Sequence, residues 1–82
     1  MITLKEFKKL IKEAGYKYKT YISGYYNKHR FLQILDKENN FICGAGANVY
    51  TQETINQYKE AFNLINTYKD KVYDKEGDKV LF

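Results

Sequence analysis

The chain has 82 residues, a formal net charge of +4, and hydrophobic and aromatic contents of 44% and 17%. This apolar content excludes disorder of the whole chain, because disordered chains combine low hydrophobicity with high net charge. The length predicts a single domain over residues 1–82 with one core. We expect neither a signal peptide nor a transmembrane helix, because the apolar runs are too short. The lone cysteine, Cys43, fits a reducing compartment, so we expect a cytoplasmic protein.

The positive charge is concentrated in the first third of the chain. Residues 1–32 contain eight Lys and Arg residues and two Glu, whereas residues 33–82 contain six Lys and eight Asp and Glu. Such a field attracts a polyanion or an acidic protein surface. A solvated, lysine-coated helix explains the same pattern without any partner.

A first helix is predicted from Leu4. Thr3 and Glu6 have the spacing of a capping box, in which the Thr oxygen accepts from the amide three residues on. Apolar residues then recur at helical spacing, at Leu4, Phe7, Leu10, Ile11 and Ala14. Gly15 is expected to end the helix because glycine readily adopts the left-handed conformation.

Three strands are predicted next. Residues 16–23 alternate with a period of two and are rich in β-branched and aromatic residues. After a tight turn at Asn27 and Lys28, residues 30–35 read as a second strand that is apolar on both faces. Residues 36–40 form a polar loop, and a third strand runs from Phe41 to Tyr50. These strands make an antiparallel meander.

Thr51 is predicted to cap a second helix that runs from Gln52 to about Lys69 or beyond. Its buried stripe is expected to contain Ile55, Tyr58, Phe62, Ile65 and Tyr68.

The tail, residues 71–82, contains a turn signal at residues 74–78. Either the second helix extends to about Tyr73 and the last residues add an edge strand, or the tail is a separate short hairpin. We expect the edge strand. The predicted fold class is therefore α+β in two layers, with the order helix, three-stranded antiparallel meander, helix (αβββα) and a short C-terminal edge strand.

The predicted turns place Gly24 beside Phe31 and Leu35 beside Phe41. In that register one face of the sheet receives the helices, and it carries Tyr18, Thr20, Ile22, Phe31, Gln33, Leu35, Phe41, Cys43 and Ala45. The other face is expected to be exposed, and it carries Lys19, Tyr21, Tyr25, Arg30, Leu32, Ile34, Ile42, Gly44 and Gly46. A one-residue slip would exchange the faces. A helix on each face, or a tail folded over the sheet, would leave nothing exposed.

An exposed apolar patch rimmed by Tyr and Arg is typical of protein interfaces. The candidate protein-binding residues are Tyr21, Tyr25, Arg30, Leu32, Ile34 and Ile42. The same mixture suits single-stranded nucleic acid, in which bases stack on aromatic rings and cations contact phosphates. For this alternative the candidate residues are Lys5, Lys8, Lys9, Lys12, Lys17, Lys19, Lys28 and Arg30. A symmetric homodimer that buries the same face is a third possibility.

The residues that could perform chemistry are few. The chain has one Ser, one Cys and one His, and the predicted strands hold Cys43 and His29 too far apart to form a catalytic pair. One of each cannot build a metal site, and residues 74–78 lack the pattern of a calcium loop. Gly44 and Gly46 do not form a phosphate-binding motif and are expected to mark a bulge or a close backbone approach. We therefore expect a non-enzymatic protein without a cofactor.

In element order the chain is similar to double-stranded RNA-binding domains, whose second helix begins with lysines that contact phosphates. Here residues 51–54 are Thr-Gln-Glu-Thr, and Lys59 is the one cation in the first two turns, which argues against that function.

The residue usage, rich in Lys, Asn, Ile and Tyr with no Pro and no Trp, is typical of AT-rich genomes and their viruses. In usage, size, element order and lack of catalytic residues, the whole chain resembles small phage-encoded inhibitors of host defence, such as anti-CRISPR proteins. The resemblance implies a protein in the host cell cytoplasm that occludes a surface of a larger protein or protein–nucleic acid complex. We expect no membrane partner, because the apolar runs are short.

Overall fold

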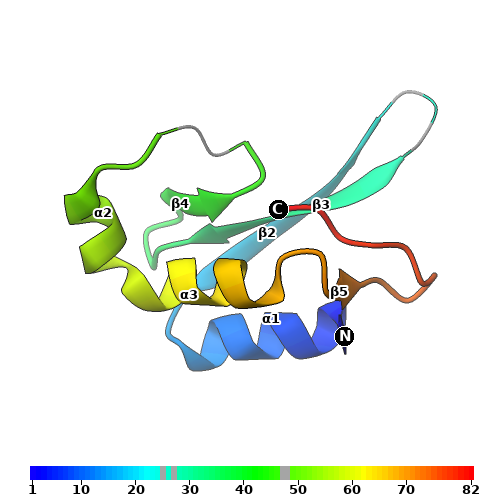
Figure 1. Cartoon of the computed structure of the whole chain (residues 1–82), viewed down its shortest axis with the longest axis horizontal. Coiled ribbons are helices and arrows are strands. Elements are labelled where there is room, and N and C mark those ends of the chain that lie inside the picture. The colour runs from blue at the N-terminus through cyan, green and yellow to red at the C-terminus, as the bar shows by residue number, and fades with distance from the viewer. Residues whose placement is uncertain (25, 27, 47–48) are drawn as a thin grey trace.

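Figure 1 shows the computed structural model of the chain, which describes residues 1–24, 26, 28–46 and 49–82. The elements in chain order are β1 (Ile2–Thr3), α1 (Leu4–Glu13), β2 (Lys17–Ser23), β3 (His29–Leu35), β4 (Phe41–Gly44), α2 (Gln52–Gln57), α3 (Lys59–Tyr68) and β5 (Val72–Tyr73). The strand order β2-β3-β4 is antiparallel throughout. The predicted α+β class, with a helix, a meander and a helical segment, is confirmed.

Helix α1 begins and ends where its sequence signals predict. The Thr3 Oγ1 atom accepts a hydrogen bond from the Glu6 amide at 3.2 Å. Gly15 follows the helix with a φ of +89°, a conformation that glycine adopts at little cost. The amphipathic stripe turns Phe7 and Ile11 into the core, where both are fully buried.

The meander is asymmetric. β2 pairs with β3 along its whole length, from Lys17 beside Leu35 to Ser23 beside His29. β4 pairs with the second half of β3, and a register shift occurs between Ile34 and Leu35. β4 ends at Gly44, so the predicted third strand is shorter than expected, and its residues Ala47 and Asn48 lie outside the described residues.

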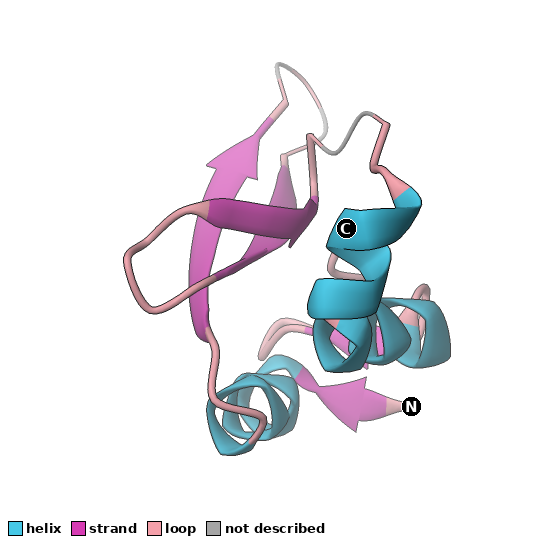
Figure 2. Cartoon of the chain, turned by 90° about the vertical axis from the view of Figure 1, so that its left-hand side faces the viewer, coloured by secondary structure: helices cyan, strands magenta, loops and turns pink. Residues whose placement is uncertain are grey.

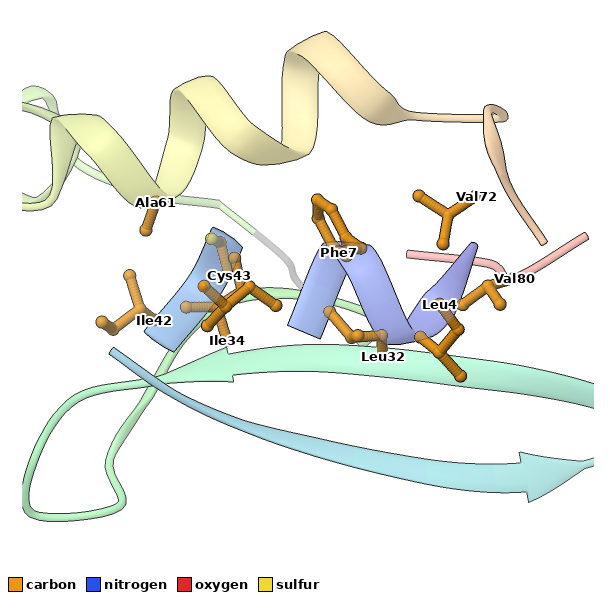
Figure 3. Packing of buried hydrophobic residues seen from close by; sticks show 10 residues of the cluster. Leu4, Phe7, Leu32, Ile34, Ile42, Cys43, Ala61, Val72 and Val80 are labelled. Atoms are coloured by element: carbon orange, nitrogen blue, oxygen red, sulfur yellow. The ribbon is translucent and has the colours of Figure 1, made fainter. Parts of the chain in front are cut away.

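Helices α1 and α3 lie on the same side of the three-stranded sheet, as the two views in Figures 1 and 2 show. The core fills the space between them. Its buried apolar side chains are Leu4, Phe7, Ile11, Leu32, Ile34, Ile42, Cys43, Ala61, Val72 and Val80. Figure 3 shows Phe7 of α1 and Ala61 of α3 facing the strand residues Leu32, Ile34 and Ile42.

The second helical segment is divided. Thr51 caps α2 through its Oγ1 atom, which accepts from the Thr54 amide at 3.1 Å, as predicted. The helix breaks at Tyr58, whose φ of −114° and ψ of 40° are not helical, so the single predicted helix is wrong at this residue. The Tyr58 ring meets Tyr16 edge-on at this break, with 6.4 Å between centroids. Most of the predicted stripe packs against the core, namely Tyr58, Phe62, Ile65 and Tyr68.

The tail combines parts of the two predicted alternatives. The extension of the helix to Tyr73 is wrong, because α3 ends at Tyr68. Tyr73 and Lys79 form an antiparallel bridge, as in the predicted hairpin. β5 pairs in parallel with β1, a pairing that the sequence did not predict. A turn follows, in which Asp74 Oδ1 accepts from the amides of Glu76 and Asp78. The chain then returns to the sheet, and Leu81 forms a parallel bridge with Phe31. The predicted edge segment is therefore present as a short pairing with β3.

Within the described part of the chain, none of the helices has the length and apolar character needed to cross a bilayer.

Candidate binding surface

The face of β3 that points toward the helices is the opposite of the predicted one. Tyr21, rather than Gly24, pairs with Phe31, which is a shift of three residues. An odd shift exchanges the two faces of a strand relative to its neighbour. Leu32 and Ile34 therefore point into the core with 0% of their surface exposed.

Ile42 is also buried, because the irregular pairing of β4 leaves both Ile42 and Cys43 inside. The prediction that Leu32, Ile34 and Ile42 lie on an exposed face is wrong. Phe41 was expected to face the helices but is exposed and pairs with Leu35 of the outer face. Ile22 lies on the inner face of the sheet, as expected, but 57% of its surface is exposed.

The remaining predicted protein-binding residues lie in different places. Tyr21 is exposed, as expected. Arg30 is half-buried and lines a groove between Lys5 and Lys8 of α1 on one side and the turn at Asp74 on the other. Tyr25 lies outside the described residues.

The face of the sheet opposite to Leu32 and Ile34 carries aromatic and cationic side chains. Because Leu32 and Ile34 point inward, the alternate residues of β3 and their partners in β2 point outward. These are Lys17, Lys19, Tyr21, Ser23, His29, Phe31, Gln33 and Leu35. We call this set the open face. Figure 2 shows that α1 lies on the other side of the sheet, and residues of α3 approach the open face only at a groove beyond the end of β4.

Two aromatic rings form the centre of the open face. Tyr21 and Phe31 are cross-strand partners, and their rings stack with 5.4 Å between centroids and an interplanar angle of 16°. Such offset stacking contributes about 0.5–1.5 kcal/mol beyond the area that the rings bury. The pair therefore holds a flat aromatic surface that is partly open to solvent.

Four of the predicted nucleic-acid-binding lysines lie in or beside β2, which is an edge strand of the sheet. They are Lys17 and Lys19 of β2 and Lys8 and Lys12 of α1. The Lys8 and Lys12 ammonium groups lie 5.2 and 5.6 Å from the centroid of the Tyr18 ring, within cation–π range. Tyr18 lies on the inner side of β2, whereas Lys17 and Lys19 lie on the open face. Positive charge therefore borders this edge of the sheet on both sides.

The other predicted cations are dispersed. Lys9 is exposed on α1. Lys28 and Arg30 line a shallow pocket together with Asp74, Glu76 and Asp78, so carboxylates offset their charge. Lys5 and Lys8 line the groove beside the same acidic turn, and Lys8 also reaches the Tyr18 ring. The structure thus brings together about half of the predicted cationic set.

A groove of about 500 Å³ lies at the opposite edge of the sheet, beyond the end of β4. Its aromatic and aliphatic lining includes Tyr21, Phe31, Tyr50, Phe62, Ile65 and Phe82. Sequence reasoning missed this groove. The one signal was the pair Gly44 and Gly46, interpreted as marking a close backbone approach. That interpretation is confirmed at Gly44, where an added Cβ would lie 2.6 Å from the Leu32 carbonyl oxygen.

Cys43 and His29 do not meet. His29 is exposed at the start of β3, beside Ser23, whereas Cys43 is buried beside Ile34 near the other end of that strand. Burial raises the pKa of the Cys43 thiol to about 12, so the thiol stays protonated at neutral pH. The described residues contain no group of three His, Cys, Asp or Glu side chains that could hold a metal ion.

The fold and surface define a small α+β protein with an open three-stranded sheet face. Comparison with protein-family models, curated proteins and solved structures finds no match to this chain.

Proposed function

We propose that this protein binds single-stranded nucleic acid on its open face. The observation that carries the proposal is the stacked pair Tyr21 and Phe31, which lies beside Lys19 on the same face. Proteins that bind single strands stack bases on exposed aromatic rings and contact phosphates through cations. Every base has a flat π surface, so this mode of binding tolerates any sequence.

The distribution of charge supports the same proposal. Lys17 and Lys19 lie on the open face, and Lys8 and Lys12 lie on the other side of β2. A strand that stacks on Tyr21 and crosses β2 would bring its phosphates near these four ammonium groups.

Because the predicted apolar centre is buried, we place nucleic-acid binding first and protein binding second, the reverse of the order that the sequence favoured. A protein interface was inferred from Leu32, Ile34 and Ile42, and all three lie in the core. The open face that remains is aromatic and cationic, a composition that fits nucleic acid better than an apolar protein surface.

Binding is tested by fluorescence anisotropy with short labelled single-stranded DNA and RNA, and with a duplex for comparison. Four phosphate contacts on a single strand predict that affinity falls by about 50-fold between about 50 mM and about 200 mM salt. Absence of affinity for every strand at the lower salt concentration would exclude the proposal.

Variants locate the binding surface. Tyr21→Ala should weaken single-strand binding by about 5- to 150-fold, because loss of one stacked base costs about 1–3 kcal/mol. Lys19→Gln should lower the steepness of the salt dependence by about 0.7. Lys59→Gln is the matched control, because Lys59 is exposed at the start of α3, away from the open face. Equal losses in Lys19→Gln and Lys59→Gln would show that net charge, and not this face, governs binding.

A protein partner is the second candidate, favoured by exposed apolar side chains at the hairpin that projects from the body in Figure 1. Ile22 is 57% exposed and Tyr26 is 89% exposed. A projecting apolar tip of this kind would let a small domain occlude a surface of a larger protein, as the resemblance to phage-encoded inhibitors implies.

This candidate is tested by affinity capture from the native host with and without nuclease. It requires that one protein is retained after nuclease treatment and is lost in Ile22→Lys. Light scattering at high concentration tests the symmetric dimer, which a monomeric mass excludes.

A further inference from the structure

The groove at the β4 edge exists because two segments share one side of β3. The Ala45 amide donates to the Leu32 carbonyl at 3.0 Å, and the chain then leaves the sheet. Beyond that point Leu81 takes the next place beside β3, with the Leu32 amide donating to the Leu81 carbonyl at 3.0 Å. The edge of the sheet is therefore divided between β4 and the tail, and the groove lies against this junction.

Two aromatic pairs line the groove. Tyr21 and Phe31, the stacked pair of the open face, form one of them. Tyr50 and Phe62 form the other and pack edge-on, with 4.9 Å between centroids. The volume of about 500 Å³ lies within the range of small-molecule sites, about 300–1,000 Å³. A flat heteroaromatic group fits such walls by shape and by stacking.

Tyr50, which lines the groove, has a polar group without a partner in the described part of the chain. The Tyr50 hydroxyl is buried and makes no hydrogen bond within the described part of the chain. Burial, with a smaller contribution from Cys43, raises the pKa of Tyr50, so the hydroxyl stays neutral and can both donate and accept. An unsatisfied buried hydroxyl costs about 1–3 kcal/mol. The Tyr50 oxygen has almost no accessible surface, so a ligand atom reaches it and recovers part of that free energy only when the ring turns toward the groove.

One cationic side chain lies at the rim of the groove. Among the described residues that line it, Lys69 is the one with a charged side chain, and none is Asp or Glu. Lys69 is exposed at the C-terminal end of α3, and Asn66 lies one turn before it at the same rim. An anionic group at this rim would therefore meet an ammonium and an amide.

We propose that this groove binds one nucleotide, with its base between the aromatic walls and hydrogen-bonded to the Tyr50 hydroxyl, and its phosphate beside Lys69. The inference rests on the proposed function, because the stacked pair on the open face also lines the groove. A strand lying on the open face can pass one base over Phe31 into the groove. The open face then supplies affinity for any sequence, and the groove adds a preference for one base.

The experiment is an NMR titration of the full chain with the four ribonucleoside 5′-monophosphates, with the corresponding nucleosides, and with inorganic phosphate. We expect one base to bind more tightly than the other three, with amide shifts near Gly46 and Phe62. The same nucleoside should bind more weakly than its monophosphate, and inorganic phosphate alone should not shift these amides.

Two variants assign the contacts. Tyr50→Phe removes the hydroxyl and should weaken binding of the preferred nucleotide by about tenfold. The midpoint of urea denaturation should not fall, because the hydroxyl has no partner to lose. Lys69→Gln should weaken binding of the nucleotide but not of the nucleoside. The matched controls are Tyr73→Phe, a half-buried tyrosine outside the groove, and Lys59→Gln on the same helix as Lys69.

The outcomes separate the two proposals. If single strands bind and depend on Tyr21, but mononucleotides neither bind nor respond to Tyr50→Phe, the groove inference is wrong and the proposed function stands. If mononucleotides bind in the groove but no single strand binds, the proposed function fails and the groove remains. If inorganic phosphate alone reproduces the shifts, recognition of a base is excluded.

Discussion

Gly44 decides where the third strand of the sheet ends. Its φ is +121°, in the region that favours glycine, and an added Cβ would meet the Leu32 oxygen at 2.6 Å and the Gln33 Cα at 2.9 Å. Real Cβ atoms do not approach backbone this closely, so a side chain at this position forces the two strands apart. Because the chain turns out of the sheet here, the next place beside β3 is left to Leu81.

Gly44→Ala is expected to reduce the free energy of unfolding by more than about 3 kcal/mol, since backbone strain and a backbone clash act together. Gly15→Ala is the matched control, because Gly15 has a φ of +89° but no atom within 4 Å of its added Cβ. The control should lose about 1–2 kcal/mol from backbone strain alone. Urea denaturation measures both variants, and equal losses would contradict the close approach at Gly44.

At the scale of the elements, the β2–β3 hairpin determines which side chains form the core. β3 is apolar on both faces, so its pattern does not distinguish the inner face from the outer one. The register of the hairpin makes the distinction, and it places Leu32 inside and Phe31 outside. The stacked aromatic pair on the open face is a direct consequence of this register.

The register is tested by a pair of alanine variants. Leu32→Ala should lower the free energy of unfolding by about 2–5 kcal/mol, because it leaves a cavity beneath α1. Ile22→Ala should change it by no more than about 0.5 kcal/mol, since Ile22 is 57% exposed. The predicted register requires the reverse order, so a larger loss in Ile22→Ala than in Leu32→Ala would refute the observed pairing.

At the scale of the whole molecule, the fold is closed by segments from both halves of the chain. The Phe7 ring of α1 stacks on Phe82 at 5.3 Å and meets Tyr68 edge-on at 5.6 Å. Val80 is buried beside this group, and β5 pairs with β1. The N-terminal helix is therefore held in place by residues from the end of the chain.

The stability of the whole molecule should fall at alkaline pH. Burial raises the pKa of Cys43 from 9.0 to about 12, so the folded chain keeps a proton that the unfolded chain loses above about pH 9. The unfolded state then binds fewer protons, and stability decreases with rising pH by up to about 1.4 kcal/mol per pH unit between these values. Urea denaturation at about pH 8 and pH 10 measures this slope.

The Cys43→Ala variant should lose most of the slope in that window. Tyr16 and Tyr50, whose pKa values are also raised by burial, contribute above about pH 10. A slope that persists unchanged between about pH 8 and pH 10 in Cys43→Ala would assign the effect to other groups.

Part of the candidate binding surface could be predicted from the sequence. Tyr21, Lys17 and Lys19 lie in a strand with clear alternation, and the predicted exposure of Tyr21 and Lys19 agrees with the structure. Phe31 could not be placed outside, since that depends on a register shift of three residues. The groove at Tyr50 could not be predicted either, because its lining comes from five separate parts of the chain.

The features that the sequence determined are local ones. Thr3 and Thr51 start helices and Gly15 ends one, because each acts through hydrogen bonds or dihedral angles within a few residues. The tertiary structure alone decided which face of β3 is buried and where Leu81 joins the sheet. Those outcomes depend on contacts between residues far apart in the chain. Such contacts form only when the whole core is assembled, so no local pattern determines them.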